Sequence, residues 1–192
     1  MRWTLRRCDP AWFEQRDEGD GFVKLHIKAK VVSIHEKMEV LDENDELVYR
    51  VSSKAISIHD KTHIEDAAGN EVAFIHAKAM SIHHVYYVEM ADGTGYTMKE
   101  ELTHLLDHID VEELGWQLRG ENVLAFDFDV YDADERLLAK AHRKLVSMHG
   151  IYYIDIVDES RADELIALFV VVKHIIDQRQ QVVTTPAASS TN

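Results

Sequence analysis

Hydrophobic and polar residues alternate along most of the chain, from residue 22 to about residue 157. Successive side chains of a β-strand point to opposite faces, so this alternation predicts strands with one buried face. Acidic turn sequences such as Asp42-Glu43-Asn44-Asp45 separate the alternating runs. The pattern predicts twelve strands, at residues 22–32, 36–42, 46–54, 60–66, 71–78, 84–90, 95–102, 108–113, 115–119, 123–131, 136–146 and 150–157.

A short motif recurs four times and indicates that one structural unit is reused. The motif is Lys-x-x-Ser-Ile-His, with Met in place of Ile in the last copy, and its serines are Ser33, Ser57, Ser81 and Ser147. The first three serines are 24 residues apart, and an acidic turn lies within each unit. Short strands with such regular turns are typical of an antiparallel meander in a barrel or sandwich.

Residues 161–179 have a different pattern, because Leu165 to Val172 is apolar without interruption. Acidic residues precede this run and basic residues follow it, which suits a helix dipole. The spacing predicts a helix with Ser160 as its N-cap and Asp163 completing a capping box. Its apolar part is about a dozen residues, against roughly 20 needed to span a bilayer. We therefore expect a helix enclosed by protein, with a buried strand as the alternative.

These elements together predict a mainly β fold, a roughly twelve-stranded antiparallel β-barrel enclosing one apolar C-terminal α-helix. A barrel of this size is too wide for its own side chains to fill, and the helix would fill it. The predicted organisation is an N-terminal extension at 1–21, the barrel with its helix at 22–180 and a disordered tail at 181–192. Residues 98–110 fit both strand and helix spacing, so both alternatives stay open.

Four features also suggest a family. They are the Lys-x-x-Ser-Ile-His corners, the strands joined by acidic turns, Gln117-Leu118-Arg119-Gly120 before Phe126-Asp127-Phe128, and the helix ending Ile176-Asp177-Gln178. Over residues 22–180 the chain resembles the LURP-one-related family of the Tubby C-terminal-like superfamily. The resemblance implies a β-barrel threaded by a central helix. It implies no assigned activity, because the phosphoinositide binding of Tubby relatives does not transfer with the fold.

Composition and charge narrow the classes of function. The chain has 192 residues and a net charge of −14, which disfavours binding to nucleic acid. Cys8 is the only cysteine, so no internal disulfide can form. The first residues lack the apolar segment of a signal peptide, and no stretch qualifies as a transmembrane helix. We take the cytoplasm as the predicted location.

Two histidines raise the hypothesis of a metal-dependent enzyme. His104 and His108 are four residues apart, with Asp107 and Asp110 nearby, and on a helix both imidazoles would share one face. The glutamate of a His-Glu-x-x-His motif is absent. The chain also contains no Gly-x-Ser-x-Gly sequence and no phosphate-binding glycine loop. We therefore predict no catalytic residue and no cofactor, and keep the two histidines as weak metal candidates.

Basic residues recur just before the corners and are the main candidates for binding. They are Lys28, Lys30, Lys54, Lys78, Arg143 and Lys144. Equivalent positions of a meander lie at one end of a barrel, so these residues would form a basic cluster. The alternative is that they extend along the surface or pair with turn carboxylates.

The sequence thus predicts a non-enzymatic binding or scaffold domain for an unknown protein or anionic ligand. Peripheral binding of anionic phospholipid headgroups through the basic cluster is the alternative function.

Overall fold

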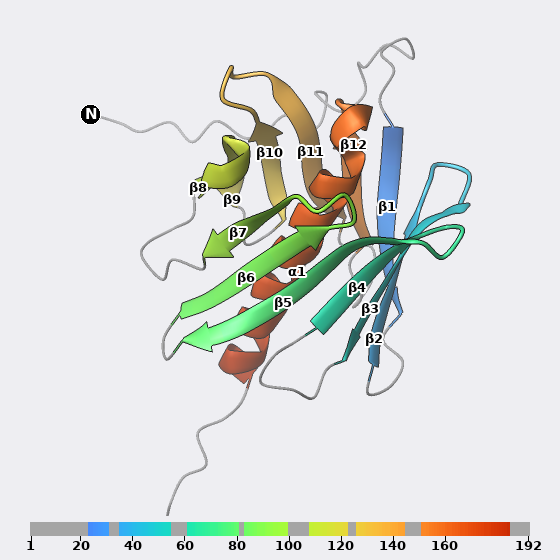
Figure 1. Cartoon of the computed structure of the whole chain (residues 1–192), viewed down its shortest axis with the longest axis horizontal. Helices are drawn as coiled ribbons and strands as arrows, with labels where there is room; N and C mark the ends of the chain where they lie inside the picture. Colours follow the sequence, from blue (N-terminus) through green and yellow to red (C-terminus); the bar gives the residue numbers. More distant parts are fainter. Residues whose placement is uncertain are drawn as a thin grey trace, which may run out of the picture.

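The computed structural model describes residues 23–30, 35–54, 61–80, 83–99, 108–122, 126–144 and 151–184. Within these ranges twelve strands precede one α-helix (Figure 1). The strands are β1 (Val23–Lys30), β2 (His35–Leu41), β3 (Leu47–Lys54), β4 (Lys61–Asp66), β5 (Glu71–Met80), β6 (His83–Met90), β7 (Gly95–Lys99), β8 (His108–Val111), β9 (Trp116–Asn122), β10 (Asp127–Tyr131), β11 (Leu137–Lys144) and β12 (Ile151–Ile156). The helix α1 is Ala162–Thr184, and two 3₁₀ turns are η2 (Glu112–Leu114) and η4 (Glu159–Arg161). All twelve predicted strands are present, with small differences at their ends.

The strands form one antiparallel sheet in the order β7-β6-β5-β4-β3-β2-β1-β12-β11-β10-β9-β8. The first strand pairs with the last, Val23 lying opposite Ile156, and this ladder joins the two halves of the sheet. β7 and β8 are the two ends of the order, and no ladder joins them within the described residues. The antiparallel β fold with a C-terminal helix is therefore confirmed, whereas closure into a barrel stays a prediction.

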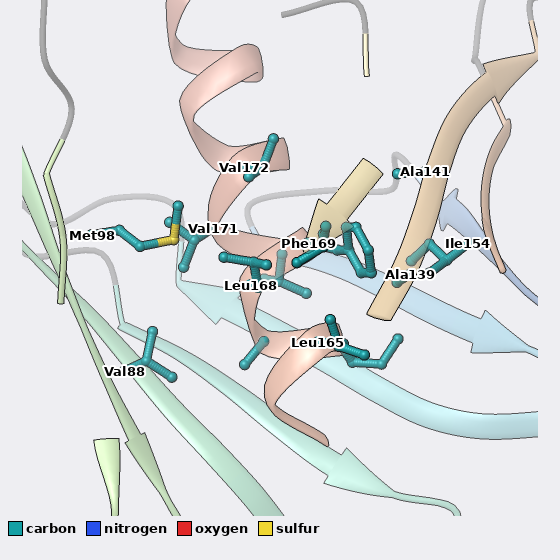
Figure 2. Packing of buried hydrophobic residues seen from close by; sticks show 14 of the residues in the cluster. Val88, Met98, Ala139, Ala141, Ile154, Leu165, Leu168, Phe169, Val171 and Val172 are labelled. Atoms are coloured by element: carbon teal, nitrogen blue, oxygen red, sulfur yellow. The ribbon is translucent and has the colours of Figure 1, made fainter. Parts of the chain in front are cut away.

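The helix α1 is buried on every side along its apolar run. Each residue of Leu165–Val172 is at most 1% exposed. Figure 2 shows Val88 and Met98 on one side of the helix, and Ala139 and Ile154 on the opposite side. Burying one large apolar side chain contributes roughly 1.5–3 kcal/mol. The sheet and the helix therefore stabilise each other, as the sequence predicted.

Two tyrosines of the sheet fix the first turn of α1. The Tyr49 hydroxyl donates to Asp163 Oδ1 at 2.7 Å, and the Tyr96 hydroxyl donates to the carbonyl oxygen of Glu164 at 3.0 Å. Burial, followed by the hydrogen bond and charge of Asp163, raises the pKa of Tyr49 well above its usual range. Burial also raises the pKa of Tyr96. These contacts set the position of the helix along the sheet.

The predicted capping box and helix end are both wrong. Ser160 lies in the η4 turn, where its N–H and hydroxyl donate to Asp158, while the carboxylate of Asp163 accepts from Tyr49 instead. The helix also continues past Arg179 to Thr184, so the first residues of the predicted disordered tail are helical. The remainder of that tail and the predicted extension at 1–21 lie outside the described residues.

Aspartates organise the turns at one end of the sheet. Asp42 Oδ1 accepts from the N–H groups of Asn44 and Glu46, each at 2.8 Å. The equivalent aspartates are Asp66, Asp92, Asp132 and Asp158. Hydrogen bonds from Asn70, Thr94 and Arg136 lower the pKa of Asp66, Asp92 and Asp132, respectively. We call this end, where α1 begins, the turn end, and the opposite end the corner end.

Replacing Val171 with aspartate tests whether α1 is the core of the fold. Val171 is 0% exposed, so Val171→Asp places a charge where the surrounding side chains are apolar. We expect this variant not to fold. The matched variant Leu168→Ala should fold but lose about 2–5 kcal/mol in the free energy of unfolding. A cooperative thermal melt of soluble Val171→Asp, followed by circular dichroism, would contradict the central role of α1.

Replacing Tyr49 with phenylalanine tests the attachment of the helix. The variant should lose about 1.5–3 kcal/mol at neutral pH, the range for hydrogen bonds to charged groups. Because the pKa of folded Tyr49 is raised, its contribution is complete below the pKa of unfolded tyrosine, near 10, and falls above it. Urea denaturation between about pH 9 and about pH 11 should therefore show a weaker pH dependence in Tyr49→Phe than in the wild type. Tyr87→Phe, on the outer face beside His76, is the control for removal of a tyrosine hydroxyl away from α1.

Candidate functional site

Apart from the tyrosine hydroxyls that bond to the first turn of α1, the buried polar side chains of the described structure lie toward the corner end. Its buried polar or charged residues are Ser53, Thr62 and Lys173. Ser53 and Thr62 lie opposite each other in the β3–β4 register, and Thr62 Oγ1 is 3.3 Å from Nε2 of His174. Lys173 follows the apolar run of α1 and is only 6% exposed. The interior therefore becomes polar where the helix approaches the corner end.

Two cations at this end face the same aromatic ring. Arg143 continues the inward-facing series of Ala139 and Ala141 on β11, and it lies opposite Tyr152 in the register of β11 with β12. Its Cζ atom is 5.3 Å from the centroid of the Tyr152 ring, and Lys173 Nζ is 5.4 Å from the same centroid. Cation–π attraction favours both contacts. We call Ser53, Thr62, Arg143, Tyr152, Lys173 and His174 the inner polar cluster.

The packing below Tyr152 holds its ring in place. Phe126 is 0% exposed, and its ring meets that of Tyr152 edge-on, with centroids 4.5 Å apart and planes 67° apart. Phe126 also lies against Phe169 of α1, at 6.2 Å between ring centroids. Edge-to-face aromatic pairs prefer such geometry. A fixed tyrosine ring gives Arg143 and Lys173 a rigid common neighbour.

Arg143 lacks the acidic partner that Arg119, Arg136 and Arg161 have. Its Nε is buried without a hydrogen-bond acceptor, and no carboxylate pairs with its guanidinium within the described residues. By contrast, Arg119 on the outer face donates to both carboxylate oxygens of Glu135, at 2.5 and 2.6 Å. On β2 the backbone of Glu36 lies opposite Ser53, so one acidic residue neighbours the cluster in the sheet. A guanidinium without a carboxylate partner keeps donors that suit an anion.

Of the six basic residues predicted to form a cluster, the structure describes the side chains of two, Lys78 and Arg143, and these two lie on opposite faces of the sheet. Lys30, Lys54 and Lys144 end β1, β3 and β11 at the corner end, as expected for the backbone. Lys78, in contrast, is exposed on the outer face of β5, and Arg143 faces inward. Alternation along a strand puts neighbouring residues on opposite faces, which separates Arg143 from Lys144. The ligand-binding role of these residues stays a prediction.

Sequence reasoning missed Tyr152, Thr62 and the role of Lys173. One signal was available, since Lys173 and His174 interrupt an otherwise apolar helix. The ring that brings Arg143 and Lys173 together could be found only from the strand register and the rotation of α1.

The metal hypothesis concerns a part of the chain that is only partly described. His104 lies outside the described residues, and His108 is the first residue of β8. Met98 lies in β7 and Asp110 in β8, so the described ends of the ambiguous stretch 98–110 are strands. The described ranges contain no group of three or more His, Cys, Asp or Glu side chains suited to a metal ion. Metal binding at these histidines stays a hypothesis.

These features define a mainly β protein in which an antiparallel sheet surrounds a C-terminal helix with a polar cluster at one end. The family model LURP-one-related matches residues 23–173, and the chain belongs to this family, as the motifs predicted. An X-ray structure of a protein from Arabidopsis thaliana is similar in fold. Its TM-score is 0.51 at 16% sequence identity, covering 81% of this chain and 92% of the plant chain.

Two further comparisons complete this description. A comparison with curated proteins gives no match. Among the helical residues that the structure describes, no segment is long and apolar enough to cross a membrane.

Replacing Arg143 with methionine tests whether this residue stabilises the fold. Methionine keeps a long side chain beside Tyr152 and removes the charge of a guanidinium whose Nε has no acceptor. Replacing buried charges with apolar residues is often neutral or stabilising. We expect the free energy of unfolding to rise or to stay within about 1 kcal/mol of the wild-type value. As a comparison, Tyr152→Ala should cost about 3–5 kcal/mol in urea denaturation; a similar loss in Arg143→Met would assign Arg143 a structural role.

Proposed function

We propose that the protein is a non-enzymatic binding domain that recognises an acidic partner at its corner end. The observation that carries this proposal is that acidic turn residues and basic strand-end residues lie at opposite ends of the sheet. Aspartates organise the turns at the turn end. Lys30, Lys54 and Lys144 end their strands at the corner end, where Arg143 and Lys173 also lie. An acidic ligand would therefore be repelled from one end and attracted to the other.

In this proposal the sheet closes around α1 as a barrel, and the ligand binds at its end and not within it. Contacts of α1 with strands that are far apart in the sheet support this arrangement. Tyr49 of β3 and Tyr96 of β7 bond to its first turn, while Phe128 of β10 lies 5.6 Å from Phe169, between ring centroids. The helix thus occupies the space that a ligand would need inside a barrel.

The net charge of −14 makes a local field necessary for recognition of an anion. Like charges over most of a surface oppose association, whereas a local patch of opposite sign steers the ligand to one orientation. The corner end would then determine which ligand binds and also the side of the protein from which that ligand approaches. This reasoning favours an acidic protein segment over a nucleic acid, whose phosphate charges extend along the whole molecule.

Binding of a fluorescent oligoglutamate peptide tests the proposed function. Fluorescence anisotropy should show binding that weakens with salt, and an oligolysine peptide should not bind at the corner end. The double variant Lys54→Gln/Lys144→Gln should lose up to about 2 kcal/mol of binding free energy, roughly 30-fold in affinity. The control Lys24→Gln/Arg50→Gln removes the same charge nearer the turn end and should have a smaller effect. Equal losses in both double variants would contradict a binding surface at the corner end.

The alternative function, binding to anionic phospholipid headgroups, would use the same basic residues. Flotation with phosphatidylserine vesicles, compared with neutral phosphatidylcholine vesicles, separates the two functions. Salt-sensitive flotation that the Lys54→Gln/Lys144→Gln variant loses, without binding of the acidic peptide, would replace the proposed function with this alternative.

A further inference from the structure

We propose that the outer face of β4, β5 and β6 is a contact surface for a second copy of this chain, centred on Phe74 of β5. The three strands are neighbours in the sheet (Figure 1). This surface lies on the side of the sheet away from α1, between the turn end and the corner end. The proposal is therefore independent of the proposed function.

A row of rings crosses this outer face. Ile75 is buried, so alternation along β5 turns its neighbours Phe74 and His76 outward. The rings follow one another in the order His63, Phe74, His76 and Tyr87, with neighbouring centroids 4.8, 5.7 and 5.0 Å apart. All four side chains are partly exposed. Aromatic residues of this kind are enriched where proteins contact one another.

The hairpin of β11 and β12 repeats the hairpin of β5 and β6 and serves as an internal comparison. When Ser147 is aligned with Ser81, Lys140 takes the place of Phe74. Lys140 Nζ lies 3.6 Å from Asp129, so this position is an ion pair on the outer face of the second hairpin. Charged and aromatic cross-strand pairs both stabilise a sheet. The sheet therefore does not require an apolar ring at this position.

The two hairpins otherwise carry the same outward pair of rings. His76 is stacked on Tyr87 in one hairpin, and His142 is stacked on Tyr153 in the other, with centroids 5.0 and 5.2 Å apart. The stacked pair thus belongs to the repeated unit. Phe74 is the feature that distinguishes the face of β5 and β6, and contact with another apolar surface explains it.

The charges of β5 favour a second copy as the occupant of this face. Glu71 and Lys78 are exposed and lie on opposite sides of Phe74 and His76 along the strand. The structure shows no carboxylate partner for Lys78 among the described residues. A twofold axis that lies in the interface and crosses β5 between the two rings brings Lys78 of each copy over Glu71 of the other. The surface is then complementary to itself, as a closed dimer requires.

The net charge and the size of the face set the expected strength of the contact. Two copies that each carry a charge of −14 repel each other at long range. Three strands with about 4.8 Å between them and a length of about 20 Å outline roughly 300 Å², against about 800 Å² per partner in a standard interface. We expect a reversible dimer with a dissociation constant between about 1 µM and about 1 mM.

Sedimentation equilibrium of the full chain, from about 10 µM to about 1 mM in about 150 mM salt, tests the proposal. The wild type should show a reversible equilibrium between monomer and dimer. Phe74→Lys copies Lys140 of the equivalent hairpin, so it should keep the fold and weaken the dimer at least about tenfold. Tyr87→Ser should also weaken it, whereas the matched variant Tyr153→Ser should leave it unchanged.

Exchanging the charges tests the twofold arrangement. Glu71→Lys and Lys78→Glu should each weaken the dimer, because each places like charges opposite one another. An equimolar mixture of these two variants should associate, since each then supplies the charge that the other lacks. The double variant Glu71→Lys/Lys78→Glu should dimerise again for the same reason.

Four outcomes would overturn the proposal. They are a wild type that stays monomeric at every concentration, a dimer that Phe74→Lys retains, equal losses in Tyr87→Ser and Tyr153→Ser, and a mixture of the two charge variants that does not associate. If Phe74→Lys does not fold, Tyr87→Ser and the charge variants provide the test.

Discussion

The structure depends on burying a helix that is apolar around its whole circumference. Such a helix has no face to turn toward water, so its surroundings must enclose it. The sheet makes room for it with small inward-facing residues, Ala73 and Ala77 on β5 and Ala139 and Ala141 on β11. Larger side chains fill the remaining space, and the Phe126 and Phe128 rings reach Phe169 of the helix. Sheet and helix thus each supply the apolar surface that the other must cover.

This constraint also decides where the polar interior lies. Tyr49 and Tyr96 hold the first turn of α1 at the turn end, so the length of the apolar run sets the level at which Lys173 appears. One helical turn advances the chain by about 5.4 Å. A shift of that size along the axis would remove Lys173 from the Tyr152 ring. The hydrogen bonds at one end of the helix therefore position a charge at the other.

The sequence was sufficient for the strands and for the helix, because periods of two and continuous apolar runs are local patterns. Details that depend on contacts between residues far apart in the chain could not be predicted from the sequence. Asp163 bonds to Tyr49, far away in sequence, and not to the turn that precedes it. Gly120 of the family motif has a similar explanation: a Cβ atom there would lie 2.2 Å from the carbonyl oxygen of Asp127 on the neighbouring strand. The inner polar cluster depends on the register of two strand pairs, β3 with β4 and β11 with β12, and on how α1 is rotated about its axis. A linear sequence pattern contains neither kind of information.

A charged side chain in the inner polar cluster lowers the stability of the fold. Its presence therefore suggests a role other than packing. A half-buried guanidinium without a paired carboxylate weakens a fold, and an apolar residue of similar size would serve the packing as well. Arg143, whose Nε is buried without an acceptor, nevertheless occurs in a protein whose net charge is −14. An exposed cation is screened by solvent and salt, whereas a cation within the sheet is screened less. The same sheet that buries the helix thus also places two cationic side chains, from β11 and α1, against the ring of Tyr152.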